Sequence, residues 1–84
     1  MQTENLIFEL ARPLLVMKAA KGFLACGYIN VETTNKTGEA CAIVTGVSSY
    51  DDMLAAKVSA VSTAAQELGV AIGDSGAEAL AKLG

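Results

Sequence analysis

Gly73-Asp74-Ser75-Gly76-Ala77-Glu78-Ala79-Leu80 is the stretch that decides the fold, because it marks a helix start residue by residue. Ser75 followed three positions later by Glu78 is a capping box, in which each side chain accepts a hydrogen bond from the other residue's backbone N–H. Apolar positions after the box keep the helical period as far as Leu83. The sequence therefore predicts a final helix from residue 76 to residue 83.

A second helix start precedes it at Gly46-Val47-Ser48-Ser49-Tyr50, where Ser49 can cap a helix. Apolar residues then recur at steps of three and four, as on one face of a helix. They are Met53, Leu54, Val58, Val61, Ala64, Ala65 and Leu68. This period predicts one main helix of roughly 20 residues, which at 1.5 Å per residue would be about 30 Å long. Because that exceeds any strand here, we expect a break near residues 56–57.

Four segments upstream have the pattern of strands, at about 5–10, 14–17, 23–27 and 40–45. In the first, Leu6, Phe8 and Leu10 alternate with Ile7 and Glu9, as in a strand with one face in the core and one face partly wet. The connection between the second and third is short, which predicts an antiparallel hairpin. Segments 23–27 and 40–45 lack polar alternation, so we expect them to be the central strands, covered on both faces.

Between the central strands, Asn30 can begin a helix and Gly38 can end it, although the residues between them favour one or two turns at most. A strand, a short crossover and a strand form a parallel pair. The predicted fold class is α/β (α+β), a single domain over residues 1–84. Its mixed four-stranded sheet has the order strand, strand, strand, short helix, strand, helix, helix, with helices mainly on one face.

The composition predicts apolar surface that one chain cannot hide. Of the 84 residues 52% are hydrophobic, and the mean hydropathy is +0.43. A partner subunit or a membrane would cover such surface. The longest uncharged runs, 40–50 and 22–31, are far shorter than the roughly 20 residues of a spanning helix. We therefore expect a homo-oligomer without a membrane partner. The polar, acidic start is unlike a secretory signal, so the expected location is the cytoplasm.

Charge and residue types exclude several function classes. The net charge is −3, and the six basic residues are scattered singly, so we expect no nucleic-acid partner. The chain has no histidine, which removes the Ser-His-Asp and Cys-His arrangements. Two cysteines alone cannot close a tetrahedral zinc site. We expect no metal and no cofactor, and the sequence favours a non-enzymatic role.

Cys26 and Cys41 both lie in apolar runs. In a reducing compartment we expect two thiols, and a disulfide is the alternative. Cys26, which precedes Gly27 near a strand end, is the candidate catalytic thiol. A reactive thiol needs a nearby base or cation, and Lys21 or the turn 73–76 would have to assist. A buried structural cysteine is the favoured interpretation.

The turn made by Gly73, Asp74, Ser75 and Gly76 is the candidate ligand-binding segment. Small residues at a helix start expose backbone N–H groups, where the helix dipole favours an anion. Against this, Glu78 can satisfy the cap internally, and Asp74 adds a negative charge at the same place. Helix capping is therefore the favoured interpretation of this turn.

Four blocks in order give the chain a family resemblance. They are Gly22-Phe23-Leu24-Ala25-Cys26-Gly27, Gly46-Val47, Ala64-Ala65-Gln66-Glu67-Leu68-Gly69-Val70 and Gly73-Asp74-Ser75-Gly76-Ala77-Glu78-Ala79-Leu80. In their order and spacing the chain resembles the YunC-like family of small uncharacterised bacterial and archaeal proteins, over residues 7–83. The resemblance implies a mixed sheet with helices and no established biochemical role.

Together these observations predict a homo-oligomeric binding or structural module. Its leftover apolar surface would meet a second copy and frame a pocket for a small molecule or peptide at the junction. The alternative is a small thiol-dependent enzyme that uses Cys26.

Overall fold

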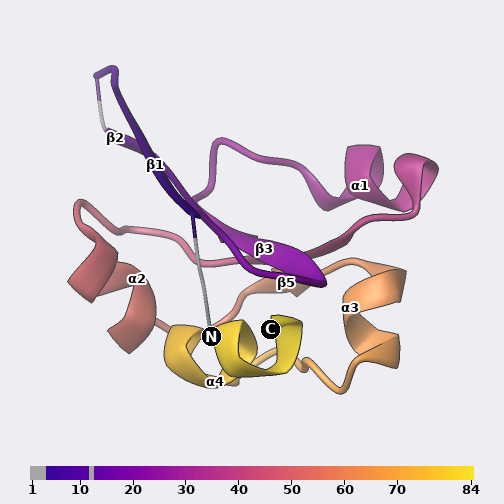
Figure 1. Ribbon diagram of the computed structural model, residues 1–84. Coiled ribbons are helices and arrows are strands. Elements are labelled where there is room, and N and C mark those ends of the chain that lie inside the picture. Colours follow the sequence, from indigo (N-terminus) through magenta and orange to yellow (C-terminus); the bar gives the residue numbers. More distant parts are fainter. Residues whose placement is uncertain (1–3, 12) are drawn as a thin grey trace.

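The computed structural model describes residues 4–11 and 13–84, and these form one mixed sheet with helices on both faces (Figure 1). The strands are β1 (Glu4–Glu9), β2 (Pro13–Lys18), β3 (Gly22–Ala25), β4 (Ala40–Ile43) and β5 (Ala60–Val61). The helices are α1 (Val31–Thr37), α2 (Tyr50–Ala55), α3 (Thr63–Glu67) and α4 (Gly76–Leu83). Among the described residues no helix is long and apolar enough to cross a bilayer.

The strands follow one another across the sheet in the order β1-β2-β3-β4-β5. Neighbours are antiparallel except β3 and β4, which run parallel. The predicted mixed sheet, the antiparallel hairpin of β2 and β3 and the parallel central pair are confirmed. The predicted strand number is wrong, because the described residues form a fifth strand, β5, which the sequence pattern did not reveal.

The predicted single main helix is also wrong. Helix α2 ends at Ala55, and the following Ala56 has an extended ψ of 159°, so the chain does break near the expected position. It then continues as a strand: Ala60 and Val61 pair with Ile43 and Ala42 of β4. Without β5 the outer edge of β4 would bury unpaired backbone N–H and C=O groups. The free energy lost by leaving them unpaired exceeds the free energy that local helix propensity would contribute.

Helix α3 begins only after β5, at a cap provided by Ser62. The Ser62 hydroxyl accepts a hydrogen bond from Ala65 N (3.3 Å), as an N-cap does. It also accepts from Cys41 N (2.8 Å) and donates to Glu39 O (2.9 Å). This fully buried hydroxyl therefore fastens the start of β4 to the start of α3.

Side chains of β4 alternate between the two faces of the sheet. Ala40 and Ala42 belong to the larger core, which α2, α3 and α4 cover. Cys41 and Ile43 belong to a smaller cluster on the α1 side, which includes Val31. Figure 1 shows α1 on one side of the sheet and the other helices on the opposite side. The prediction of helices mainly on one face agrees with this arrangement.

The final helix forms as the capping box predicts. Glu78 N donates to Ser75 Oγ, and Ser75 N donates to Glu78 Oε1, both at 3.1 Å. Gly76 brings the helix against α2 so closely that an added Cβ would collide with the carbonyl oxygen of Met53. At the other end Leu83 is fully buried, and its carbonyl accepts from Lys21 N (2.8 Å).

The short crossover helix agrees with its predicted caps. Asn30 accepts a hydrogen bond from Glu32 N (2.8 Å), and Gly38 ends the helix with a positive φ of 79°. Its seven residues make about two turns, which is the predicted upper limit.

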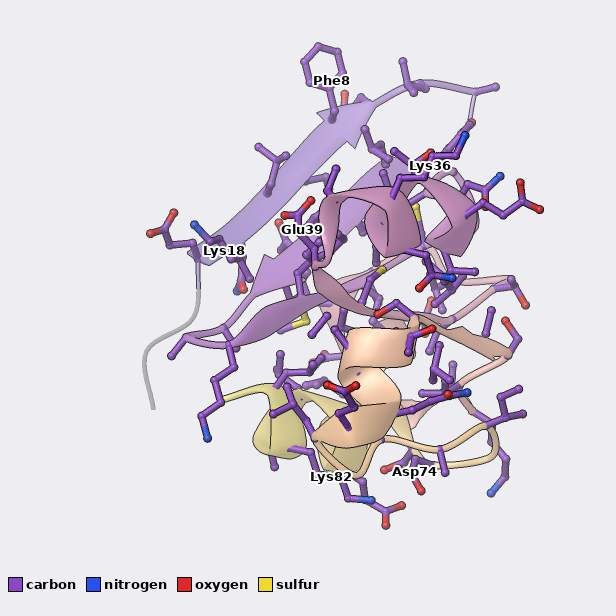
Figure 2. All side chains as sticks on the ribbon, turned by 90° about the vertical axis from the view of Figure 1, so that its right-hand side faces the viewer. Phe8, Lys18, Lys36, Glu39, Asp74 and Lys82 are labelled. Atoms are coloured by element: carbon purple, nitrogen blue, oxygen red, sulfur yellow. The ribbon has the colours of Figure 1, made fainter. Side chains whose placement is uncertain are left out.

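All residues of strand β1 are exposed, so the prediction that one of its faces lies in the core is wrong. Leu6, Ile7 and Phe8 are 54%, 50% and 60% exposed, and Leu10 in the following turn is 51% exposed. Figure 2 shows Phe8 pointing outward, away from the helices. The surplus apolar surface that the composition predicts is therefore concentrated on one strand and its turn.

Candidate functional site

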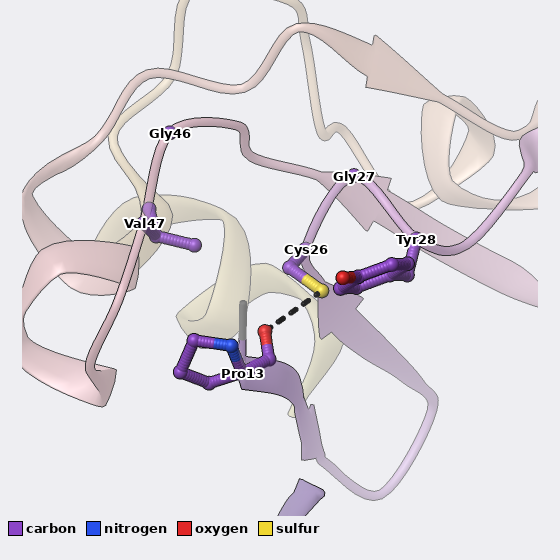
Figure 3. A pocket seen from close by; sticks show the side chains of 6 residues that line it. All are labelled: Pro13, Cys26, Gly27, Tyr28, Gly46 and Val47. Atoms are coloured by element: carbon purple, nitrogen blue, oxygen red, sulfur yellow. Dashed lines mark hydrogen bonds between the residues drawn. The ribbon is translucent and has the colours of Figure 1, made fainter. Parts of the chain in front are cut away.

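A cavity of about 320 Å³ lies at the end of the sheet where the parallel strands β3 and β4 finish (Figure 3). Among the described residues its lining comprises Pro13, Cys26, Gly27, Tyr28, Gly46 and Val47. The chain leaves β3 towards α1 on one face and leaves β4 towards α2 on the other. Crevices at the carboxyl ends of strands whose connections diverge in this way are the usual ligand sites of open sheets.

The local sequence opens this cavity with small residues. Gly27 follows β3, and Gly46 follows β4 with a φ of 72°, which glycine adopts without steric cost. No side chain from either glycine fills the space between the two strand ends. Val47 then turns inward, is 5% exposed and joins the larger core.

Cys26 is held inward on the cavity wall. Its Sγ accepts a hydrogen bond from Leu15 N at 3.3 Å. The thiol also donates a hydrogen bond to Pro13 O at 3.9 Å. In Figure 3 the ring of Tyr28 lies beside the sulfur. The residue is only 4% exposed, so the thiol is a minor part of the wall that a ligand would touch.

The predicted assistants of Cys26 lie elsewhere. Lys21 precedes β3 while Cys26 follows it, so the two residues are at opposite ends of that strand. The turn 73–76 begins helix α4 and is not among the described residues that line the cavity. The structure therefore does not bring the thiol, Lys21 and this turn together, and thiol chemistry at Cys26 stays a prediction.

Cys41 has a structural environment. It is fully buried on the α1 side of the sheet, whereas Cys26 belongs to the core on the opposite side. Burial raises the pKa of the Cys41 thiol to about 12; the nearby Glu39 charge adds to the increase and a hydrogen bond with Thr34 opposes it. Both cysteines are free, in agreement with the prediction of two thiols.

The turn from Gly73 to Gly76 uses its backbone N–H groups internally. Gly73 N donates to Val58 O, Asp74 N to Ala71 O and Gly76 N to Ala56 O, at 2.8–3.1 Å. Ser75 N donates to Glu78, as described above. Because all four amides of the turn already have acceptors, these contacts favour capping over the binding of an anion.

The carboxylates of this turn are also engaged. Asp74 Oδ2 lies 2.8 Å from Lys82 Nζ and accepts from Ala71 N at 3.0 Å. The hydrogen bond from Lys82, and then the one from Ala71, lower the pKa of Asp74. Hydrogen bonds from Ser75 lower the pKa of Glu78 in the same way. Both carboxylates therefore stabilise the start of α4.

A second hollow, of about 480 Å³, lies at the opposite end of the sheet, around the turn between β2 and β3. Lys18 and Lys21 line it together with Glu39 and Glu67, so its charge is mixed and selects no class of ligand. In the part of the chain that the structure describes, no group of three or more Cys, Asp or Glu residues could hold a metal ion.

Sequence reasoning identified Cys26 but missed the rest of the cavity wall. Tyr28 and Val47 follow the two strands that were predicted to be central and parallel. The signal that could have found them is the pair Gly27 and Gly46, one after each strand, because the carboxyl ends of parallel strands meet at one edge. Pro13 reaches the cavity only through the antiparallel pairing of β2 with β3, which is a non-local contact.

Comparisons with known proteins give a family but no activity. A family model described as "Domain of unknown function (DUF1805)" matches residues 25–83, which include β4, β5 and the helices. The crystal structure of a protein of unknown function, TA1206 from Thermoplasma acidophilum, is similar to this chain at 36% sequence identity, with a TM-score of 0.84. That similarity covers 99% of this chain and 94% of the other. No curated protein matches the chain. The matches support a family of uncharacterised domains, and the YunC-like name stays a prediction.

Proposed function

The chain belongs to the DUF1805 family, whose function is unknown, and we propose that it is a self-associating binding module with a small-ligand pocket near the subunit junction. The single observation that carries the proposal is strand β1, on which Leu6, Ile7 and Phe8 are each at least half exposed. Three adjacent large apolar side chains at one edge of a small domain are typical of an interaction surface. The similarity to TA1206 covers 99% of this chain, so it extends to this strand.

The exposed area sets the expected strength of association. Full burial of a Leu, Ile or Phe side chain contributes about 1.5–3 kcal/mol, so completing a half-finished burial contributes about 1 kcal/mol. Three side chains from each of two copies give at most roughly 6 kcal/mol before the entropic cost of association is subtracted, whereas a micromolar complex needs about 8 kcal/mol of net binding free energy. We therefore expect a weak homodimer that forms only well above micromolar concentrations.

Sedimentation velocity over a concentration series tests self-association. The wild-type chain is expected to sediment as a monomer at about 1 μM and mainly as a dimer at about 500 μM. The double variant Leu6→Ser with Phe8→Ser is expected to remain monomeric at both. Ile72→Ser is the matched control, because Ile72 is a large apolar residue, 67% exposed, in the link between α3 and α4. A monomeric wild-type chain at the highest concentration contradicts the proposal.

The cavity at the ends of β3 and β4 is the proposed ligand pocket. It adjoins the hairpin, since Pro13 both lines the cavity and pairs with Glu9 of β1. Its described lining has no formal charge, and the polar side chains among these residues are the thiol of Cys26 and the phenol of Tyr28. Such a wall suits a small neutral molecule with an apolar body and one hydrogen-bonding group.

Phenol and indole are suitable probes of this pocket. In a two-dimensional NMR titration they are expected to shift the amide signals of Gly27, Tyr28 and Gly46 first. The variant Gly27→Ala, whose Cβ would lie 3.4 Å from Thr45 Cγ2, narrows the space beside the pocket without a severe collision, so weaker binding is expected. Shifts that arise first at the turn 73–76, or that are equal in the variant, contradict the assignment.

A thiol-dependent enzyme is the second candidate, and one observation favours it: Cys26 lies on the wall of the proposed pocket. Reaction with iodoacetamide between about pH 6 and pH 9 separates the two candidates, because an activated thiolate reacts across this range. A catalytic Cys26 is expected to react faster than Cys41 at every pH, and Cys26→Ser removes that fast phase. Equal, slow modification of both cysteines eliminates the enzyme.

A further inference from the structure

We propose that the partner of β1 is the same strand of a second copy, paired antiparallel along its outer edge, with Ile7 opposite Ile7 of the second copy. This inference rests on the proposed self-association and specifies its geometry. The two sheets would join into one continuous sheet across a two-fold axis.

The outer edge of β1 is open to such pairing. Strand β1 occupies the end of the sheet and pairs on one side with β2, residue for residue from Glu4 with Lys18 to Glu9 with Pro13. Natural proteins usually protect an edge strand with lysine, proline or a bulge. The six residues of β1, Glu-Asn-Leu-Ile-Phe-Glu, contain neither lysine nor proline, and the continuous register shows no bulge.

Both faces of β1 are apolar at its centre. Leu6 and Phe8 project from one face and Ile7 from the other, because successive side chains alternate. A strand with only one covered face would alternate apolar and polar residues, whereas apolar residues on both faces are typical of a strand that is covered on both faces. A second β1 strand at the outer edge would set apolar side chains beside Leu6 and Phe8 on one face and beside Ile7 on the other, and so reduce their exposure.

Symmetry and charge favour an identical, antiparallel strand. Two copies related by a two-fold axis perpendicular to the sheet place their β1 strands antiparallel, and this contact closes as a dimer. Parallel in-register pairing of identical strands would set Glu4 beside Glu4 and Glu9 beside Glu9 of the second copy, and like charges in directly paired positions repel each other.

The side-chain faces then select the register. Residues directly opposite each other in an antiparallel pair share a face, so the symmetric pair must be centred on a residue of β1. Centring on Leu6 would set Asn5 opposite Ile7 and Glu4 opposite Phe8, which places polar groups against apolar ones. Centring on Ile7 sets Leu6 opposite Phe8 and Asn5 opposite Glu9, so apolar faces apolar and the amide can donate to the carboxylate.

Cysteine cross-linking measures this register directly. At the proposed centre the two Cα atoms of residue 7 would lie about 4.5–5.5 Å apart, within reach of a disulfide. The two Leu6 residues would be offset by two positions, or about 7 Å along the strand, which is out of reach. The experiment therefore compares Ile7→Cys with Leu6→Cys under mild oxidation at about 500 μM, with the wild-type chain as control for its two buried cysteines.

The expected result is a covalent dimer of Ile7→Cys that forms at least tenfold faster than that of Leu6→Cys. Mixing Leu6→Cys with Phe8→Cys is expected to restore fast cross-linking between the two variants. Faster cross-linking of Leu6→Cys alone overturns the register. If the chain dimerises in sedimentation but neither Ile7→Cys nor the mixture cross-links, the edge pairing is wrong while self-association stands. A monomer throughout overturns both proposals.

A measurement on the wild-type chain removes any dependence on how the variants fold. Pairing along the outer edge would protect alternate backbone amides of Glu4–Glu9, those that point away from β2. Their hydrogen exchange is expected to slow at least tenfold between about 1 μM and about 500 μM protein. Unchanged exchange of these amides in a chain that dimerises overturns the edge pairing.

Discussion

Strands β1 and β4 are both apolar, but β1 is exposed and β4 is buried. All four residues of β4 are buried, and three of them are the small residues Ala40, Cys41 and Ala42. Strand β1 has the larger side chains Leu6, Ile7 and Phe8, and all its residues are exposed. The difference lies in cover: β4 has a strand on each side and helices on both faces, whereas β1 has a single neighbour in the described sheet, β2. Position in the sheet, and not the hydrophobicity of the segment, decides burial.

The largest expected effect on stability comes from a comparison of leucine-to-alanine substitutions in β2 and in β1, the two strands of the first hairpin. Leu15 is fully buried, and Leu15→Ala is expected to lower the free energy of unfolding by about 3–4 kcal/mol, because it leaves a cavity in the core. Leu6→Ala is expected to cost about 1 kcal/mol or less, since Leu6 is half exposed. Urea unfolding at about 1 μM, where the monomer is expected, measures both. Equal losses would break the contrast between β1 and the core.

A glycine pair sharpens the contrast within the core. Gly76→Ala is expected to cost about 3 kcal/mol, because the new Cβ would collide with Met53 O and push α4 away from α2. Gly27→Ala is the matched control: its Cβ would meet Thr45 Cγ2 at 3.4 Å, an ordinary contact. Thermal unfolding followed by circular dichroism measures both variants. A Gly76→Ala protein as stable as the control would show that the helices do not approach so closely.

Substitution of two capping serines, one buried and one exposed, tests how much the burial of a cap adds to its contribution to stability. Ser62→Ala is expected to cost about 2–3 kcal/mol, because it removes the α3 cap and leaves the buried Cys41 N–H and Glu39 carbonyl without their partner. Ser49→Ala removes only the exposed cap of α2 and is expected to cost about 1 kcal/mol. Urea unfolding compares them directly. If the two losses were equal, the bonds of Ser62 to β4 would contribute nothing beyond capping.

The smallest expected effect is pH-dependent and concerns the start of α4. The pKa of Asp74 is lowered in the fold, so its contribution to stability is present above the unfolded pKa near 3.8 and is lost as the pH falls through the lower folded value. Asp74→Asn is therefore expected to be slightly less stable than the wild-type chain at pH 7 and to match it at strongly acidic pH. Glu67→Gln is the charge-matched control at an exposed site. A difference that grows towards acid would reverse the assigned sign.

Local signals in the sequence predicted much of the fold. Caps depend on residues that are close together in the chain, so Asn30 and Gly38 marked the two ends of α1, and Ser75 with Glu78 marked the start of α4. Strand β5 depends on a distant contact, the pairing of Ala60 and Val61 with β4, and nothing within residues 58–68 reveals it. The helical spacing of Val58 and Val61 was therefore misleading.

The candidate site likewise has one part that local sequence revealed and another that depends on contacts between distant segments. Cys26 stood out by residue type alone, but its pocket exists because segments 26–28 and 46–47 meet at one end of the sheet and Pro13 joins them through β2. The composition predicted surplus apolar surface correctly. It did not indicate that β1 would present most of it, because that depends on which strand ends up at the edge.

The contact between Leu83 and the turn before β3 also has a consequence for synthesis on the ribosome. Lys21 N donates to the carbonyl of Leu83, and an added Cβ on Gly22 would meet the Leu83 side chain at 2.9 Å. The core under β3 therefore closes only after Leu83 has been translated. Until then the nascent chain carries a hairpin whose inner and outer faces are both apolar, which makes this interval the one in which chaperone capture or aggregation competes with folding.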